Sequence, residues 1–255
     1  MKKLIIYCFA LISVLSYSAE VSKMDQLTND KYYNEYLSFK TTGNKLNALD
    51  SLTKSGENGF VQAMEVLGEV YQSGSLGIQD YKESLKWNEL AASKGAARPL
   101  TNIGIMYMNG AGVKKDYSKA LDYFLKATEA KDMKAPRYVG IFYLNGYGTN
   151  IDYAKAFSYF KMAADSNDIT GQFYIGQLYE QGLGVEKNYD LAMEWYLKSV
   201  SRGDIVASPG MVAIGKMYET GLGIAKDTNK AIEWYQKAAT VGNEDAKKIL
   251  TNFKK

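Results

Sequence analysis

An eleven-residue motif recurs along this chain, and its recurrence limits the fold more than any other feature. The motif reads IGIMYMNGAGV at 103–113, VGIFYLNGYGT at 139–149, IGQLYEQGLGV at 175–185 and IGKMYETGLGI at 214–224, with a looser copy, LGEVYQSGSLGI, at 67–78. The first glycines of successive copies are 36, 36, 36 and 39 residues apart. A fixed period of this size indicates an array in which one small unit stacks on the next.

A second motif follows each first one, for example DYSKALDYFLKA at 116–127. Its apolar residues Ala120, Leu121, Phe124 and Ala127 fall on one face of a helix. An Asp or Asn opens the segment in every copy, and these side chains cap helix N-termini well because their oxygen accepts from an unpaired N–H. Each repeat is therefore predicted to consist of helix A, a glycine turn and helix B. The predicted caps are Asp80, Asp116, Asp152, Asn188 and Asp227.

The glycine pair between the helices, such as Gly110 and Gly112, has two interpretations. A glycine loop before a helix can hold phosphate, but such a loop occurs once and usually follows a strand. Here the loop recurs between helices, which favours a turn whose first glycine ends helix A in the left-handed conformation.

The first glycine of each motif falls inside helix A, where glycine costs roughly 1 kcal/mol relative to alanine. Its repetition predicts close helix–helix approach at Gly68, Gly104, Gly140, Gly176 and Gly215. The aromatic residues that recur in helix B are predicted to form core between repeats. They are Trp87, Tyr123, Tyr159, Trp195 and Trp234, with Phe124, Phe160, Tyr196 and Tyr235 beside them.

The two motifs together resemble Sel1-like repeats, which are relatives of the tetratricopeptide repeat, and the likeness is nearly complete in residues 214–242. The resemblance implies an all-α, right-handed α/α solenoid of helix-turn-helix repeats with helix A on the concave side. We expect five repeats over 60–242, preceded by a degenerate repeat at 20–59 and followed by a capping helix at 243–255. The predicted repeat limits are 60–95, 96–131, 132–167, 168–206 and 207–242, the fourth carrying three extra residues near 201–210.

The first residues have the pattern of a secretory signal peptide. Met1-Lys2-Lys3 precede an apolar run over 4–15 and small residues at Ser18 and Ala19. The run is too short for a membrane span, which needs about 20 residues, although a retained anchor is the alternative. We expect cleavage of residues 1–19 and a periplasmic or secreted protein without cysteine, because Cys8 lies in the leader.

Catalytic chemistry finds little support in the sequence. The chain has no histidine, which excludes histidine-dependent nucleophile systems and HExxH zinc sites. Ser51 and Lys54 match the S-x-x-K pattern of serine β-lactamases, and a cysteine-rich branch of the Sel1-like family is described as binding or hydrolysing β-lactams. No S-D-N or K-T-G follows, and the cysteines of that branch are missing. We therefore predict no enzyme, no cofactor and no metal.

A partner site is expected instead on helix A, at positions that do not serve packing. By analogy with tetratricopeptide repeats, these positions lie six and two residues before the motif tyrosine and one and two after it. The predicted concave groove consists of Thr101, Ile105, Met108, Asn109, Arg137, Ile141, Leu144, Asn145, Phe173, Gln177, Glu180 and Gln181. The same positions hold Glu65, Glu69, Gln72 and Ser73 in the first repeat and Val212, Lys216, Glu219 and Thr220 in the last.

An apolar centre with a polar rim is typical of a protein-binding surface. We therefore expect a monomeric scaffold or adaptor of the bacterial cell envelope that holds a protein or peptide. The alternatives are a periplasmic immunity protein that neutralises a secreted toxin and, third, a β-lactam-binding enzyme. Loss of Lys2 and Lys3 brings the formal net charge down from +3, so nucleic acid is not an expected partner.

Overall fold

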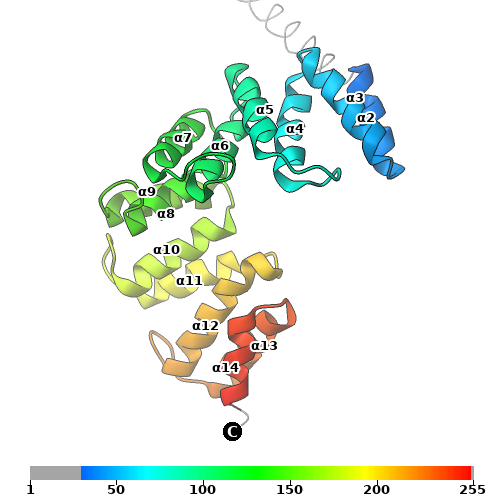
Figure 1. Cartoon of the computed structure of the whole chain (residues 1–255). Coiled ribbons are helices and arrows are strands. Elements are labelled where there is room, and N and C mark those ends of the chain that lie inside the picture. Colours follow the sequence, from blue (N-terminus) through cyan, green and yellow to red (C-terminus); the bar gives the residue numbers. More distant parts are fainter. Residues whose placement is uncertain (1–29, 254–255) are drawn as a thin grey trace, which may run out of the picture. The chain divides into compact units, whose positions relative to one another are not determined.

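The computed structural model describes residues 30–253, which contain thirteen α-helices, one short 3-10 helix and no strand (Figure 1). The predicted signal peptide lies outside the described residues. The chain divides into two compact units, one ending at Asn102 and the other beginning at Ile103, and each is described by itself. The helices are α2 (Lys31–Thr41), α3 (Lys45–Glu57), α4 (Val61–Ser73), α5 (Tyr81–Ser93), α6 (Arg98–Asn109), α7 (Tyr117–Glu129), α8 (Ala135–Asn145), α9 (Tyr153–Asp165), α10 (Ile169–Gln181), α11 (Tyr189–Ser199), α12 (Ser208–Thr220), α13 (Thr228–Thr240) and α14 (Glu244–Asn252).

Neighbouring helices pack as A/B pairs. In the first unit α2 contacts α3 and α4 contacts α5; in the second, α8 contacts α9, α10 contacts α11 and α12 contacts α13. Contacts between α3 and α4, α7 and α8, α9 and α10, and α11 and α12 stack one pair on the next within each unit. Helices α2 and α3 occupy the segment predicted as a degenerate leading repeat, and α14 packs on α13 at the C-terminal end.

The predicted close approach is confirmed at all five glycines, and an aromatic ring makes it at four of them. A Cβ atom built on Gly140 would lie 2.7 Å from two ring carbons of Phe160 and 3.0 Å from a third, which places it over the ring face. Real Cβ atoms do not come so close, so only glycine fits beneath the ring. The same contact joins Gly104 to Phe124, Gly176 to Tyr196 and Gly215 to Tyr235, whereas Gly68 faces the amide of Asn88.

The ends of the helices follow the predicted local rules. Asp116, for example, accepts a hydrogen bond from the N–H of Lys119, and the same cap begins α5, α9, α11 and α13. Gly146 ends α8 in the left-handed conformation with φ 69°, as its counterparts do at the ends of α4, α10 and α12. The glycine loop is therefore a turn between helices, as predicted.

In three turns the second glycine has a role that was not predicted from the sequence. A Cβ atom on Gly148 would lie 2.6 Å from the N atom of Ser118, at the start of helix B in the preceding repeat. Gly184 approaches the backbone of Tyr153 in the same way, and Gly223 approaches Tyr189. This glycine therefore allows one repeat to seat its turn on the previous one, in addition to reversing the chain.

The aromatic columns of helix B differ in burial. Phe124 and Phe160 are fully buried, and each stacks on a tyrosine of the next repeat: Phe124 on Tyr138 at 4.7 Å and Phe160 on Tyr174 at 4.6 Å between ring centroids. Where Asn88 replaces the ring, Asn102 occupies the tyrosine position and its Nδ2 donates to the Asn88 Oδ1 over 3.1 Å. At three repeat junctions the ring position and the tyrosine position therefore hold the same kind of side chain, aromatic at two of them and an amide at the third.

The other predicted column is less buried than expected. Trp87 is 4% exposed, but Tyr123, Tyr159, Trp195 and Trp234 are half-buried. Tyr123 and Tyr159 stack on the motif tyrosine of their own repeat, with centroids 5.7 and 5.8 Å apart. Tyr123 and Tyr159 therefore stabilise their own helix pairs. In contrast, Trp87 lies against Gly56 of the preceding helix α3 and Trp234 packs on a cluster that includes Ile169, so these two contribute to core between repeats as predicted.

We predict that Gly140→Leu lowers the free energy of unfolding by about 3 kcal/mol or more, because the side chain displaces the Phe160 ring from α8. Circular dichroism during chemical denaturation measures the loss. Lys216→Leu, at an exposed position of α12, serves as the control and should change stability little. An unchanged stability for Gly140→Leu would show that the ring does not set the separation of the two helices.

Candidate partner-binding surface

The predicted groove positions of the second unit lie on α8, α10, α12 and the C-terminal half of α6, and we refer to them as the A-face. Its exposed residues come mainly from the last turn of each helix A. The half-buried ones lie deeper along the same helices. The exposed set is Asn109, Asn145, Gln181, Lys216 and Thr220; the half-buried set is Ile105, Met108, Arg137, Ile141, Leu144, Phe173, Gln177, Glu180, Val212 and Glu219.

The apolar residues of the A-face also belong to the core. Ile105 and Met108 pack against the cluster around Phe124. Ile141 and Leu144 pack against the cluster around Phe160. Each of these side chains therefore presents one side to solvent and holds helix A to its neighbours with the other.

Thr101 differs from the other predicted residues. It belongs to the first unit and is only 3% exposed, and its hydroxyl has no hydrogen-bond partner. Its side chain is not accessible to a ligand in this structure, and we leave it out of the A-face.

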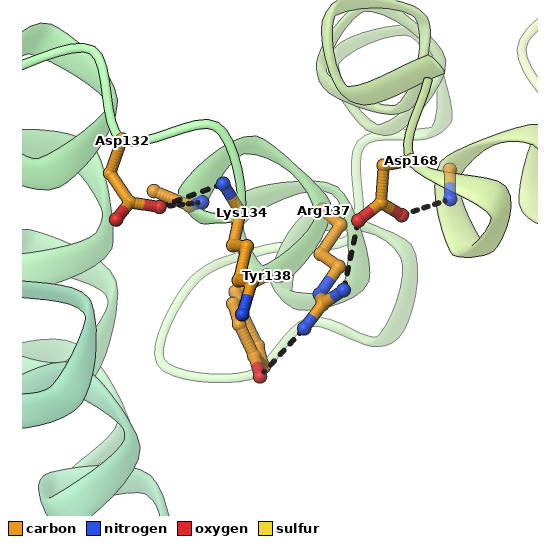
Figure 2. Close-up of polar contacts among 7 residues, drawn as sticks. Asp132, Lys134, Arg137, Tyr138 and Asp168 are labelled. Atoms are coloured by element: carbon orange, nitrogen blue, oxygen red, sulfur yellow. Dashed lines mark hydrogen bonds and ion pairs between the residues drawn. The ribbon is translucent and has the colours of Figure 1, made fainter. Parts of the chain in front are cut away.

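Arg137 is engaged with the scaffold rather than pointing freely to solvent (Figure 2). Its Nη1 donates to the Asp168 Oδ2 at 2.8 Å, and its Nη2 donates to the hydroxyl of Tyr138 at 3.3 Å. Asp168 in turn caps α10 by accepting from the N–H of Gly171. The side chains of Arg137 and Asp168 are 23% and 11% exposed, so the pair ties the start of α8 to the start of α10.

Glu180 is also held in place. Its carboxylate accepts a hydrogen bond from the hydroxyl of Tyr196 at 2.5 Å, and the Glu219 carboxylate accepts from Tyr235 at 2.6 Å. Burial, together with the hydrogen bond to Glu180 and its charge, raises the pKa of Tyr196 above its ordinary value. The two tyrosines therefore stay protonated and keep the carboxylates fixed in position.

The residue that follows the motif tyrosine on the A-face correlates with the type of buried ring on helix B. Where the buried ring is Phe124 or Phe160, the residue after the motif tyrosine is apolar, Met108 or Leu144. Where the ring is a tyrosine, that residue is glutamate. The sequence analysis missed the pairing of Glu219 with Tyr235, although comparing these two positions across the repeats would have revealed it.

The model of the Sel1 repeat family matches this chain in five segments, residues 61–95, 100–132, 137–168, 169–204 and 208–243. These segments make up more than half of the chain. The chain belongs to the Sel1 repeat family. The predicted fold class, an all-α solenoid of right-handed helix-turn-helix repeats, is thereby confirmed.

Solved structures of other proteins agree with this assignment. A Sel1 repeat protein from Oxalobacter formigenes is 26% identical and covers 89% of both chains, with a TM-score of 0.79. The protein c5321 of uropathogenic Escherichia coli, a protective antigen displaying an SLR fold, is 30% identical over 92% of this chain, with a TM-score of 0.74. This chain spans 49% of that protein. Immunity protein Pa5087 from Pseudomonas aeruginosa, 18% identical over 85% of this chain with a TM-score of 0.54, shows the fold alone. A comparison with curated protein sequences gave no match.

Ser51 and Lys54, the residues of the S-x-x-K match, lie in α3, before the first matched Sel1 segment. Ser51 is 4% exposed, and Lys54 pairs with Asp50 at 2.6 Å, a hydrogen bond that raises the pKa of Lys54. A lysine that acts as a base needs a lowered pKa, so the S-x-x-K match has the wrong environment. Within residues 30–253 there is no group of three or more potential metal-ligating side chains. None of the helices described there is both long and apolar enough to cross a membrane.

Glu180→Leu should lower the free energy of unfolding by about 1–3 kcal/mol, because the buried hydroxyl of Tyr196 loses its acceptor. Adding Tyr196→Phe should recover most of this loss, because the double variant recreates the Leu144–Phe160 pair of the third repeat. Urea denaturation of the four proteins gives the coupling energy. Additive losses would contradict this pairing of Glu180 with Tyr196.

The ion pair of Arg137 leads to a second double-mutant cycle. Asp168→Asn retains an oxygen to cap α10 but removes the charge, and Arg137→Met keeps much of the apolar stem. We expect a coupling energy of about 1–2 kcal/mol, above that of an exposed pair, because both side chains are largely shielded from water. The exposed pair Lys126–Asp122 serves as the control, and equal couplings for the two pairs would contradict this expectation.

Proposed function

We propose that this Sel1 repeat protein is a monomeric scaffold of the bacterial cell envelope that binds a polypeptide along the A-face of its second unit. One observation carries the proposal. The positions that join the helices recur from repeat to repeat, whereas other positions of helix A vary, for example Arg137, Phe173 and Val212 at one of them. In a stacked array, surface residues that vary while the packing residues stay constant are suited to recognising a partner.

The chemistry of the A-face indicates the kind of partner. Met108 on α6 and Ile141 and Leu144 on α8 supply half-buried apolar side chains on the first A helices of the second unit, and amides and carboxylates follow along α10 and α12. Apolar side chains of a bound segment would pack between neighbouring A helices. Polar groups of its backbone would meet the amides of Asn145 and Gln181 at the helix ends.

The fixed carboxylates favour binding because little side-chain freedom is lost when a partner arrives. Each of Glu180 and Glu219 uses one hydrogen bond on a tyrosine and retains other acceptor positions. A partner that carries a basic group beside an apolar side chain would therefore match this part of the A-face.

Export to the envelope rests on the first nineteen residues, whose basic start, short apolar run and small residues are typical of a cleaved leader. Fractionation of cells that produce the full chain, with mass spectrometry of the new N-terminus, tests this part. The immunity role gains no support from Pa5087 beyond its fold, and the identity of the partner will separate a toxin from an envelope component.

Site-specific photo-crosslinking tests the binding surface. A photoreactive amino acid at Asn145 or Gln181 should crosslink the same protein in the native host, because both exposed positions lie at the ends of A helices. The same probe at Ser158 or Glu194, which are exposed on B helices, serves as the control. Equal crosslinking at all four positions would contradict binding along the A-face.

A further inference from the structure

A separate hollow lies within the first unit. It has a volume of about 330 Å³ and is bounded by the end of α2, the start of α3, one face of α4 and the loop that follows α4. Ligand pockets in proteins measure roughly 300–1,000 Å³, so the hollow is large enough for a small molecule. Its apolar wall consists of Tyr36, Phe39, Val66, Val70 and Leu76.

Two residues that line the hollow differ from their counterparts in the other repeats. The residue before the motif tyrosine is Val70 here, but it is Met, Phe, Leu and Met in the other four repeats. Leu76 replaces the second turn glycine, which elsewhere brings the turn onto the preceding helix B. The side chain of Val70 takes less room than its counterparts, and the turn of the first repeat lacks the glycine at this position.

The rim of the hollow carries positive charge. Lys40 lies at the end of α2 and Lys45 is the first residue of α3, and both are exposed. In the described part of the chain, neither ammonium group is paired with a carboxylate. Glu69 also lines the hollow, but it is paired with Arg98, whose Nε lies 3.3 Å from the Glu69 Oε1. The positive N-terminal end of α3 adds to the charge of the lysines.

We propose that this hollow binds a small amphiphilic anion, a molecule with an apolar body and one carboxylate. The apolar body lies against Phe39, Val66 and Leu76, and the carboxylate meets Lys40 and Lys45 at the mouth. A single charge fits better than two, because Glu69 stands at the same rim and the wall offers little to solvate a dianion.

Isothermal titration of the full chain with octanoate, octanol and octylammonium tests the site, since the three probes share an apolar tail and differ in charge. Octanoate should bind best and octylammonium worst. Replacing both lysines, Lys40→Gln and Lys45→Gln, should weaken octanoate roughly fivefold per lysine and leave octanol unchanged. Lys119→Gln, in the second unit, is the matched control for charge.

Val70→Phe fills the hollow with the residue that α8 carries at the same position, Phe142, and should abolish binding of octanoate and octanol alike. Met217→Phe, at the equivalent position of the last repeat, should leave binding unchanged. If Val70→Phe does not fold, as judged by thermal unfolding, the two lysine replacements still decide the matter because they alter exposed side chains. No binding of octanoate to the wild-type chain, or binding that ignores both sets of variants, would overturn the proposal.

Discussion

The packing of an aromatic ring on a glycine of helix A is the contact on which the rest of the second unit depends. The face of Phe160 covers Gly140 so closely that no other residue fits there, and the contact recurs in four repeats at the same register. It brings helices A and B together, and the fully buried Phe160 ring stacks face to face on Tyr174 of the next repeat. One contact therefore joins the two helices of a repeat and prepares the surface on which the next repeat stacks.

The surfaces available for binding follow from this arrangement. The ring position is constant, and the residue that follows the motif tyrosine on helix A is complementary to the ring. This residue is apolar where the ring is phenylalanine and glutamate where the ring is tyrosine. The A-face thus acquires an apolar part and an acidic part without any change in backbone. The first repeat departs from the frame instead, with Asn88 in place of the ring and with Val70 and Leu76 beside the hollow. The binding proposed for the second unit would use residues that vary on a constant frame, and the binding proposed for the first unit would use a gap in that frame.

Local rules made much of this fold predictable from the sequence. Helix caps such as Asp152 and turn glycines such as Gly146 act on their immediate neighbours, and the family motif supplied the order of the helices. The fate of side chains on helix A was harder to predict, because it depends on partners one repeat away. Arg137 pairs with Asp168 across 31 residues, and Thr101 is buried at the end of the first unit. The groove itself stays a prediction, since only the side chains that would line it have been placed.

The ring-on-glycine contact can be measured directly by NMR. A proton above the face of an aromatic ring is shifted upfield, so one Hα of Gly104, Gly140, Gly176 and Gly215 should resonate clearly upfield of its usual position. Gly68 provides an internal control, because it occupies the same place in its helix but faces the amide of Asn88, and its Hα protons should resonate normally. Four glycines that resemble Gly68 would show that the rings do not cover helix A, and the account of the fold and of its surfaces would be wrong.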